Sequence, residues 1–319
     1  KMGSMPIGKL LFNMSLPMMI SMLVQALYNI VDSIFVAKLS ENALTAVSLA
    51  FPLQTLLIAV ATGTGVGMNA LLSRSLGEHK FKEANKIGVN AAFLYFLSYL
   101  VFLILGFTVV KPFYASQIKG ADAEIMEMGI EYLRTVMIFS FGLLAQIYFE
   151  RLLTSTGKTL FSMTSQLCGA LTNIILDPIM IFGLGPVPQM GVAGAAYATV
   201  CGQVAAAVIT AFGGVRRPPE FRKMKVYIKQ IYWLGYASIL QQAMYTVYIV
   251  ILNAILAGFS DSAVTVLGLY YKMQTFFFIP LMGLQTCIVP VLSFNYATKS
   301  YGRCRETMKD SYLFSCGFM

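Results

Sequence analysis

The sequence predicts an all-α integral membrane protein made of two helical lobes that repeat each other in parallel. Of the 319 residues, 57% are hydrophobic and only 12% are charged. The apolar residues recur in stretches long enough to cross about 30 Å of bilayer hydrocarbon, and the later part of the chain repeats the earlier part at a fixed offset. A water-soluble core is therefore excluded.

Glycine, proline and charged residues divide the chain into eight complete spans and the start of a ninth. The first apolar run has no small-residue cleavage site and is too long for a signal peptide, so we expect it to remain as a helix. The ninth span begins near residue 306. The eight complete spans are predicted at roughly 8–38, 44–76, 83–112, 123–155, 159–184, 190–214, 227–258 and 262–297.

A polar, basic and proline-broken segment from Arg216 to Lys225 separates two groups of spans. Such a composition is typical of a linker between domains. We therefore expect an N-terminal lobe at 1–215 with helices 1 to 6 and a cytoplasmic linker at 216–226. A partial C-terminal lobe follows at 227–319, with helices 7 and 8 and the start of helix 9.

The positions of lysine and arginine predict the orientation, because cytoplasmic loops retain these residues. The side opposite to the N-terminus has only Lys38, Lys111 and Lys119. The N-terminus is therefore expected to be cytoplasmic. The side of the N-terminus carries Lys1, Lys9, Arg74, Lys80, Lys82, Lys86, Lys158, the cluster at 216–229, Lys299, Arg303, Arg305 and Lys309.

An internal repeat supports the two lobes. A shift of 220 residues without gaps pairs Tyr28 with Tyr248, Gln54-Thr55 with Gln274-Thr275, Gly63 with Gly283, and Leu72-Ser73 with Leu292-Ser293. Six spans separate the two copies, so both start on the same side, as in a parallel repeat about an axis along the membrane normal. The same shift pairs Met319 with Tyr99, in the third helix of lobe one. We therefore expect this chain to be a fragment of a protein with about twelve helices.

Several functional classes are excluded by the residues. The net charge of +9 does not indicate nucleic-acid binding, since no basic face with aromatics and no binding module is present. The single histidine, His79, has no partner at metal-ligand spacing, and the five cysteines form no CxxC pair. Neither a set of nucleophile, base and electrophile nor a channel filter is visible. We expect no enzyme activity and no cofactor.

Three acids qualify as intramembrane residues, at positions where an unpaired charge is costly and marks a functional site by default. They are Asp32, Glu150 and Asp177. Asp32 could instead be a structural acid, Asp177 could stabilise a helix break before Pro178, and Glu150 could form a local ion pair with Arg151. Leu252 stands at the repeat position of Asp32, so ion chemistry is expected in lobe one only.

Polar residues share helix faces with these acids. Gln25 and Tyr28 precede Asp32 at spacings of seven and four, and Asn173 lies one turn before Asp177. On the fourth span, Tyr132, Gln146 and Glu150 would share one face of a continuous helix, and Thr199 on the sixth span adds a hydroxyl. A buried carboxylate with a raised pKa binds a proton, whereas converging oxygens also suit Na⁺. The residue types leave H⁺ and Na⁺ both open.

Most Met and Phe side chains are expected to face lipid or to pack between helices, and a minority could line an adaptable apolar cargo cavity. Lys272, inside the eighth span, either pairs with an acid across the lobes or extends toward the interface. The candidate cavity residues are Tyr28, Gln54, Lys272 and Gln274.

Several motifs resemble the multidrug and toxic compound extrusion family over the whole chain. They are Leu16-Pro17-Met18-Met19 leading to Gln25, Tyr28, Asn29 and Asp32; Gly65-Val66-Gly67; Asn173-Ile174-Ile175-Leu176-Asp177-Pro178; and Gly191-Val192-Ala193-Gly194-Ala195-Ala196-Tyr197-Ala198-Thr199. The resemblance implies twelve helices in two lobes around a central cavity. It also implies export of drugs, often cationic, in exchange for H⁺ or Na⁺.

For the prokaryotic branch of that family, the resemblance implies ion coupling by Asp32 and Asp177. It implies that their polar partners are Gln25, Tyr132, Asn173 and Thr199. Glu150 stands where relatives have Asn and would add a negative charge to this cluster. We expect a monomer in the bacterial cytoplasmic membrane. The alternative function is a lipid-linked precursor flippase, although a flippase would favour a basic cavity and the charge expected here is mainly acidic.

Overall fold

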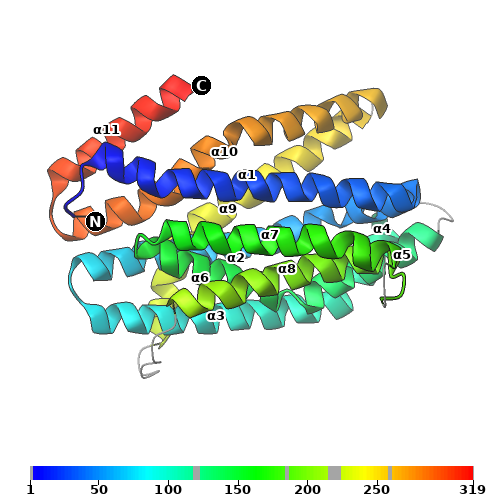
Figure 1. The fold of residues 1–319 in the computed structure, drawn as a ribbon, viewed down its shortest axis with the longest axis horizontal. Coiled ribbons are helices and arrows are strands. Elements are labelled where there is room, and N and C mark those ends of the chain that lie inside the picture. The colour runs from blue at the N-terminus through cyan, green and yellow to red at the C-terminus, as the bar shows by residue number, and fades with distance from the viewer. Residues whose placement is uncertain (1–2, 118–122, 184–186, 215–223, 258–260, 319) are drawn as a thin grey trace.

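The computed structural model describes the chain except for residues 1–2, 118–122, 184–186, 215–223, 258–260 and 319. Within helices it also leaves out the side chains of 116–117, 213–214, 224–225 and several residues between 246 and 275. All regular structure in the described residues is helical (Figure 1). The helices are α1 (Ile7–Leu39), α2 (Glu41–Gly77), α3 (Phe81–Thr108), α4 (Val110–Gln117), α5 (Ala123–Ile138), α6 (Phe141–Ser155), α7 (Thr159–Phe182), α8 (Gly191–Gly214), α9 (Met224–Ala257), α10 (Asp261–Ala297) and α11 (Tyr301–Phe318).

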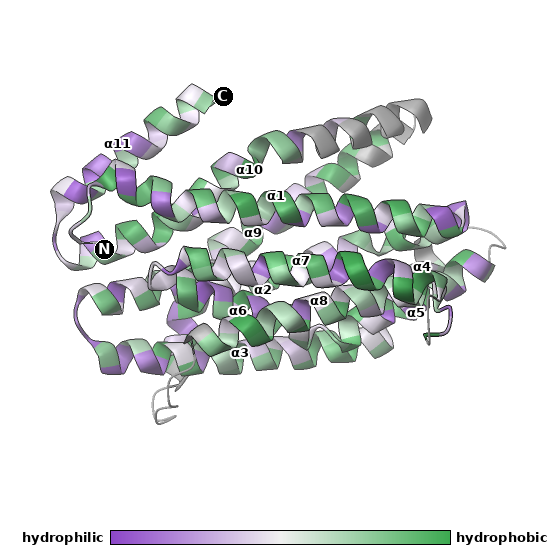
Figure 2. Ribbon diagram, viewed as in Figure 1, coloured by the Kyte–Doolittle hydropathy of each residue, from purple (hydrophilic) through white to green (hydrophobic). Residues whose placement is uncertain are grey.

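The predicted all-α membrane fold is confirmed. Six of the described helices are long and apolar enough to cross a bilayer, namely α1, α2, α3, α7, residues 191–212 of α8 and residues 276–297 of α10. The bent pair α5 and α6 would make a seventh, and α9 does not meet the criterion over its described residues. Apolar residues dominate the middle of the long helices, and polar ones are more frequent toward their ends (Figure 2).

The fourth predicted span is not one helix, and this prediction was wrong. It consists of α5 and α6, which meet at an angle of 44°. At the bend, two backbone N–H groups bond to the carbonyl three residues earlier instead of four. Ser140 N donates to Met137 O, and Gly142 N donates to Phe139 O. The third span also ends early, at Thr108, and α4 continues the chain.

The loops after α2 and after α10 repeat the same backbone geometry. His79 and Lys299, which are 220 residues apart, are the two non-glycine residues with positive φ among the described residues, and both have φ 57°. Lys80 N donates to Ser75 O and Ser300 N donates to Asn295 O, each at 2.9 Å. This backbone conformation is rare for residues other than glycine, and similar side chains do not by themselves impose it. Its presence at matching positions therefore supports the repeat.

The two lobes cross in a symmetric way. A Cβ on Gly63 of α2 would collide with Ile239 of α9, and a Cβ on Gly283 of α10 would lie 2.6 Å from Met19 Cγ of α1. Each residue of the first pair corresponds to one of the second at the same shift of 220. Helices α1 and α2 therefore pack against α10 and α9 as related pairs, with small residues allowing the backbones to approach.

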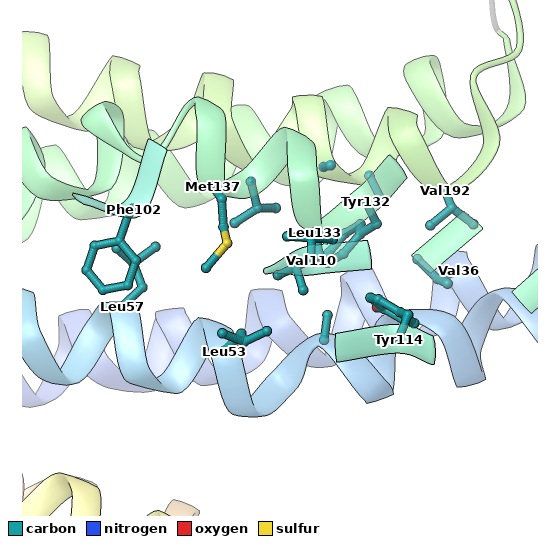
Figure 3. Packing of buried hydrophobic residues seen from close by; sticks show 14 of the residues in the cluster. Val36, Leu53, Leu57, Phe102, Val110, Tyr114, Tyr132, Leu133, Met137 and Val192 are labelled. Atoms are coloured by element: carbon teal, nitrogen blue, oxygen red, sulfur yellow. The ribbon is translucent and has the colours of Figure 1, made fainter. Parts of the chain in front are cut away.

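The core that supports the site lies inside lobe one. Figure 3 shows part of this cluster, in which Leu53 and Leu57 of α2 lie near Phe102 of α3 and Met137 of α5. Tyr114 of α4 is fully buried and donates a hydrogen bond of 2.7 Å to Ala46 O. Most of the predicted linker lies outside the described residues, so the lobe boundary stays a prediction.

Candidate functional site

The most buried part of the site lies between α7 and α8. The Asp177 side chain is 0% exposed and Asn173 is 2% exposed. Asn173 Nδ2 donates to Asp177 Oδ1 and to Thr199 Oγ1, each at 3.3 Å. With the Asn173 amide in the opposite orientation, Nδ2 lies 3.2 Å from Asp177 Oδ2 and Oδ1 accepts from Thr199 N at 3.1 Å. In both orientations Asn173 bridges the carboxylate and α8.

Asp177 does not lie at a helix break. Helix α7 continues through Pro178 to Phe182 and ends at Gly183, which has a φ of 74°. Pro178 lacks an N–H, so one carbonyl of the preceding turn loses its usual donor. The position is therefore inside a continuous helix, where a buried carboxylate is not needed to terminate it.

Helix α1 supplies the second acid. Asp32 is half-buried, and its Oδ1 atom has no hydrogen-bond partner among the described protein atoms. Asp32 interacts electrostatically with Asp177 of α7 and with Tyr132 of α5. Tyr28, one turn before Asp32, forms a side-chain hydrogen bond with Gln25 and lies within electrostatic range of both acids. The structure thus brings Gln25, Tyr28 and Asp32 to the α7 pair.

Tyr132 joins this group from α5. Its side chain is 4% exposed, and Gln54 Nε2 of α2 donates to its hydroxyl at 3.1 Å. Gln54, predicted to line a cargo cavity, therefore orients Tyr132 beside Asp32. Neutral hydrogen-bonding groups, not a lysine or arginine, surround the two carboxylates in the described part of lobe one.

A cavity of about 30 Å³ is lined by polar neighbours of the two acids, including Tyr28, Asn173 and Thr199. It is large enough for about two water molecules. Two of its lining residues, Gly169 of α7 and Gly202 of α8, let these helices approach closely, since a Cβ on Gly169 would lie 2.7 Å from Gly202 O. The lining residues are Ser21, Gln25, Tyr28, Gln146, Gln166, Gly169, Ala170, Asn173, Thr199, Gly202 and Gln203.

Glu150 does not join the acid pair, contrary to the prediction. Because α5 and α6 form an angle at residues 139–140, Tyr132 and Glu150 no longer share a helix face. Glu150 is 7% exposed and forms a side-chain hydrogen bond with Gln166 of α7. Its neighbour Arg151 is 8% exposed, yet the two side chains form no ion pair within 4 Å in the described residues.

The remaining cavity predictions have mixed outcomes. Gln274 of α10 is half-buried, and its Oε1 atom has no hydrogen-bond partner among the described atoms. The side chain of Lys272 lies outside the described residues. Sequence reasoning missed Gln166 and Gln203, although Gln166 could have been found, because it lies seven and eleven residues before Asn173 and Asp177 on one face of α7.

The chemistry of the donors suits a proton or a small hard cation. Asp32, Asp177, Asn173 and Thr199 offer oxygen atoms, which are the ligands of such cations. The described residues contain no group of three or more His, Cys, Asp or Glu side chains placed to hold a metal ion. Such a set of oxygen atoms can bind a positive charge, which the negative carboxylates would neutralise.

Comparisons with known proteins give consistent results. The MatE family model matches residues 17–179 and 237–319. A protein of Shewanella oneidensis named FAD transporter is 26% identical over 318 residues, covering 98% of this chain and 70% of the relative. The multidrug export protein MepA of Staphylococcus aureus is 26% identical over 314 residues, covering 95% of this chain and 68% of the relative. A solved transporter of the MOP superfamily from Pyrococcus furiosus matches with a TM-score of 0.91 and 26% identity, over 99% of this chain and 71% of that chain.

Proposed function

Since the chain belongs to the MatE family of membrane transporters, we propose that it exports amphipathic, often cationic compounds in exchange for H⁺ or Na⁺. One observation carries the proposal. Two acids on separate helices, Asp32 of α1 and Asp177 of α7, meet in one polar site, and no lysine or arginine among the described side chains neutralises them.

Such a site favours ion exchange for a physical reason. A carboxylate in a low-dielectric region is unstable unless it is paired, hydrated or protonated. Binding of H⁺ or Na⁺ relieves this cost, and release restores a negative site that attracts a cation. Because Asp32 and Asp177 lie on different helices, loading the site also changes the electrostatic interaction between α1 and α7.

We propose alternating access as the transport cycle. The crossings of α1 with α10 and of α2 with α9 are related by the repeat, so each lobe contributes an equivalent pair of helices to the seam. Rocking of one lobe against the other would expose the site to each side of the membrane in turn. We place the protein in the bacterial cytoplasmic membrane as a monomer, with its N-terminus in the cytoplasm.

A second cargo follows from one relative, which is named for FAD transport. FAD is anionic and would require cationic groups in the cavity. The acids of lobe one favour a cationic cargo, and they also argue against a lipid-linked precursor, which is anionic too. FAD belongs in the transport test as a competing cargo.

The test is uptake of ethidium into everted vesicles that contain the full-length protein. A proton gradient and a Na⁺ gradient are applied in turn, and unlabelled FAD is tested as a competitor. The variants are Asp32→Asn and Asp177→Asn, and the control is Glu131→Gln, which changes an exposed acid of α5.

We expect one gradient to drive uptake, and we expect both Asn variants to lose it by about a hundredfold, as expected for loss of a coupled proton or ion step. The control should behave as the wild type. Uptake that survives in both Asn variants would refute the assignment of the acids. Inhibition of ethidium uptake by unlabelled FAD would show that the cargo site also accepts an anionic compound.

A further inference from the structure

A polar stripe runs along α7 from its first turn to the acid pair. Ser162, Gln166, Asn173 and Asp177 lie at spacings of four, seven and four, so they share one face of the helix. Between Gln166 and Asn173 this face carries only Gly169 and Ala170, and the cavity of about 30 Å³ lies there. The gap in this row of polar side chains is therefore large enough for about two water molecules.

Unsatisfied polar atoms mark the far end of the stripe. Ser162 is 0% exposed, and its hydroxyl has no hydrogen-bond partner among the described atoms. Gln166 lines the cavity and also bonds to the buried Glu150 carboxyl group. Glu150 thus lies one hydrogen bond away from the cavity, behind the Gln166 side chain.

Glu150 has an unusual charged neighbourhood for a membrane helix. Arg151 follows it directly, and the Arg151 Nε atom has no hydrogen-bond partner among the described atoms. The Arg151 stem packs against α2, where a Cβ on Gly65 would lie 2.8 Å from Arg151 Cγ. Tyr95 of α3 and Cys287 of α10 are further titratable groups among the described residues that interact electrostatically with Glu150. The positive charge of Arg151 stabilises the ionised form of Glu150 electrostatically, although the two described side chains form no ion pair within 4 Å.

We propose that Glu150 is a proton-transfer station that exchanges protons with the Asp32–Asp177 site through water in this cavity. The proposal rests on the proposed function and specifies its proton-coupled form. The O–H bond of a protonated Asp32 or Asp177 breaks, and the proton passes through the hydroxyl of Tyr28 or Thr199 to cavity water. A new O–H bond then forms on Glu150 after Gln166 rotates aside. Protonated Glu150 leaves Arg151 without its neighbouring negative charge, and the O–H bond on Glu150 breaks again when the proton returns to the cavity water.

The station differs from the acid pair in what it controls. Asp32 and Asp177 decide whether an ion is bound at all. Glu150 decides how fast a proton enters or leaves, because a path through buried carboxyl and water is faster than one that crosses apolar packing. Replacing Glu150 should therefore change a rate and leave the affinity for cargo unchanged.

The experiment measures proton release by the purified full-length protein in weakly buffered detergent solution with a pH indicator. Stopped-flow mixing with ethidium gives the release rate, and titration with ethidium gives the dissociation constant. The variants are Glu150→Gln and Ala170→Val, which fills the cavity without touching Glu150. The control is Glu131→Gln, an exposed acid in the other half of the bent pair. Thermal unfolding verifies that each variant is folded.

We expect both Glu150→Gln and Ala170→Val to slow proton release by about tenfold or more. The number of protons released and the dissociation constant should stay within about twofold of the wild type, a difference of under about 0.5 kcal/mol. Glu131→Gln should match the wild type. Wild-type release rates in folded Glu150→Gln would overturn the proposal, and so would slowing by the control.

The two proposals fail in different ways. If ethidium transport is driven by Na⁺ alone and binding releases no proton, the proposed function stands and the proton station is overturned. If the wild type neither binds nor transports ethidium under either gradient, the proposed export of cationic compounds fails, and the proton station fails with it.

Discussion

At the scale of single residues, the site depends on neutral partners around buried acids. Asn173 connects Asp177 to α8, and Gln54 orients Tyr132 beside Asp32. These amides and hydroxyls lower the cost of burying a carboxylate without neutralising it. The acids therefore stay available for an exchangeable ion, which a fixed lysine or arginine would displace.

We predict that Asn173→Ala weakens ion-driven ethidium uptake by about tenfold to a hundredfold. The variant removes a donor from a buried carboxylate, and such a loss costs about 1–3 kcal/mol. The measurement is the H⁺ or Na⁺ concentration that gives half-maximal uptake. Asn42→Ala, which removes an exposed hydrogen bond to Glu124, is the control, and an equal effect of both variants would contradict the prediction.

The loop between α2 and α3 contains a small charge network outside the membrane. Glu78 lies 2.7 Å from Lys80 Nζ and 3.0 Å from Arg74 Nε. Hydrogen bonds from Lys80 and then from Arg74 hold the pKa of Glu78 below its usual value. A lowered pKa in the folded state stabilises the fold above the unfolded pKa, and this stabilisation is lost as pH falls through the folded pKa.

We predict that Glu78→Gln slightly lowers the melting temperature at pH 7, since exposed ion pairs contribute little. The difference from the wild type should shrink as pH falls below about 4, where the carboxylate of the unfolded chain is protonated. Melting curves of both proteins at several pH values measure it. In a background with Arg74→Met and Lys80→Met the substitution should have no further effect, and a persistent difference there would count against the network.

At the scale of elements, small residues set how closely helices from different lobes approach. A Cβ on Gly67 of α2 would collide with Ile231 O of α9. Cys287 stands at the repeat position of Gly67, and it packs in a cluster with α1 residues such as Leu10 and Met14. The approach of α2 to α9 is therefore closer than its counterpart, and only glycine fits there.

We predict that Gly67→Ala destabilises the folded protein by about 1–3 kcal/mol, because the added methyl group meets backbone atoms that cannot move aside. Gly302→Ala is the matched control, since Gly302 is also helical and a Cβ there would meet nothing within 4 Å. That control should be neutral or stabilising by up to about 1 kcal/mol. Denaturation in detergent measures both, and equal stability of the two variants would disprove the argument.

At the scale of the whole molecule, the parallel repeat predicts two equivalent contacts between the lobes. One joins Gly63 to Ile239 and the other joins Gly283 to Met19. If the lobes rock against each other during transport, fixing either contact should stop the cycle. If the lobes moved as one body, fixing these contacts would leave the transport rate unchanged.

We predict that the cysteine pairs Met19→Cys with Gly283→Cys and Gly63→Cys with Ile239→Cys both form disulfides on oxidation, because each pair is in direct contact. Each disulfide should reduce ethidium uptake at least about tenfold, as expected when lobe motion limits turnover, and reduction should restore uptake. Gel mobility and vesicle uptake are the measurements. Variants with one added cysteine are the controls, and full uptake by a cross-linked protein would exclude rocking at that contact.

The sequence by itself determined the helical membrane fold, the repeat and the identity of the intramembrane acids. Backbone groups in hydrocarbon must bond within their own helix, so apolar runs such as those predicted at 8–38 and 44–76 can be recognised without knowledge of their neighbours. The shift of 220 residues likewise identified Gly63 and Gly283 as counterparts before their contacts were known. The pairing of Asp177 with Asn173 followed from helical spacing alone.

Only the tertiary structure decided which polar residues meet. The angle between α5 and α6 moves Tyr132 toward Asp32 and leaves Glu150 beside Gln166, whereas a continuous helix would have put Tyr132 and Glu150 on one face. Gly169 and Gly202 let α7 and α8 approach closely beside the cavity that both residues line. Periodicity describes one helix at a time, but bends and distances between helices depend on packing among several of them, and that information is not contained in any single span.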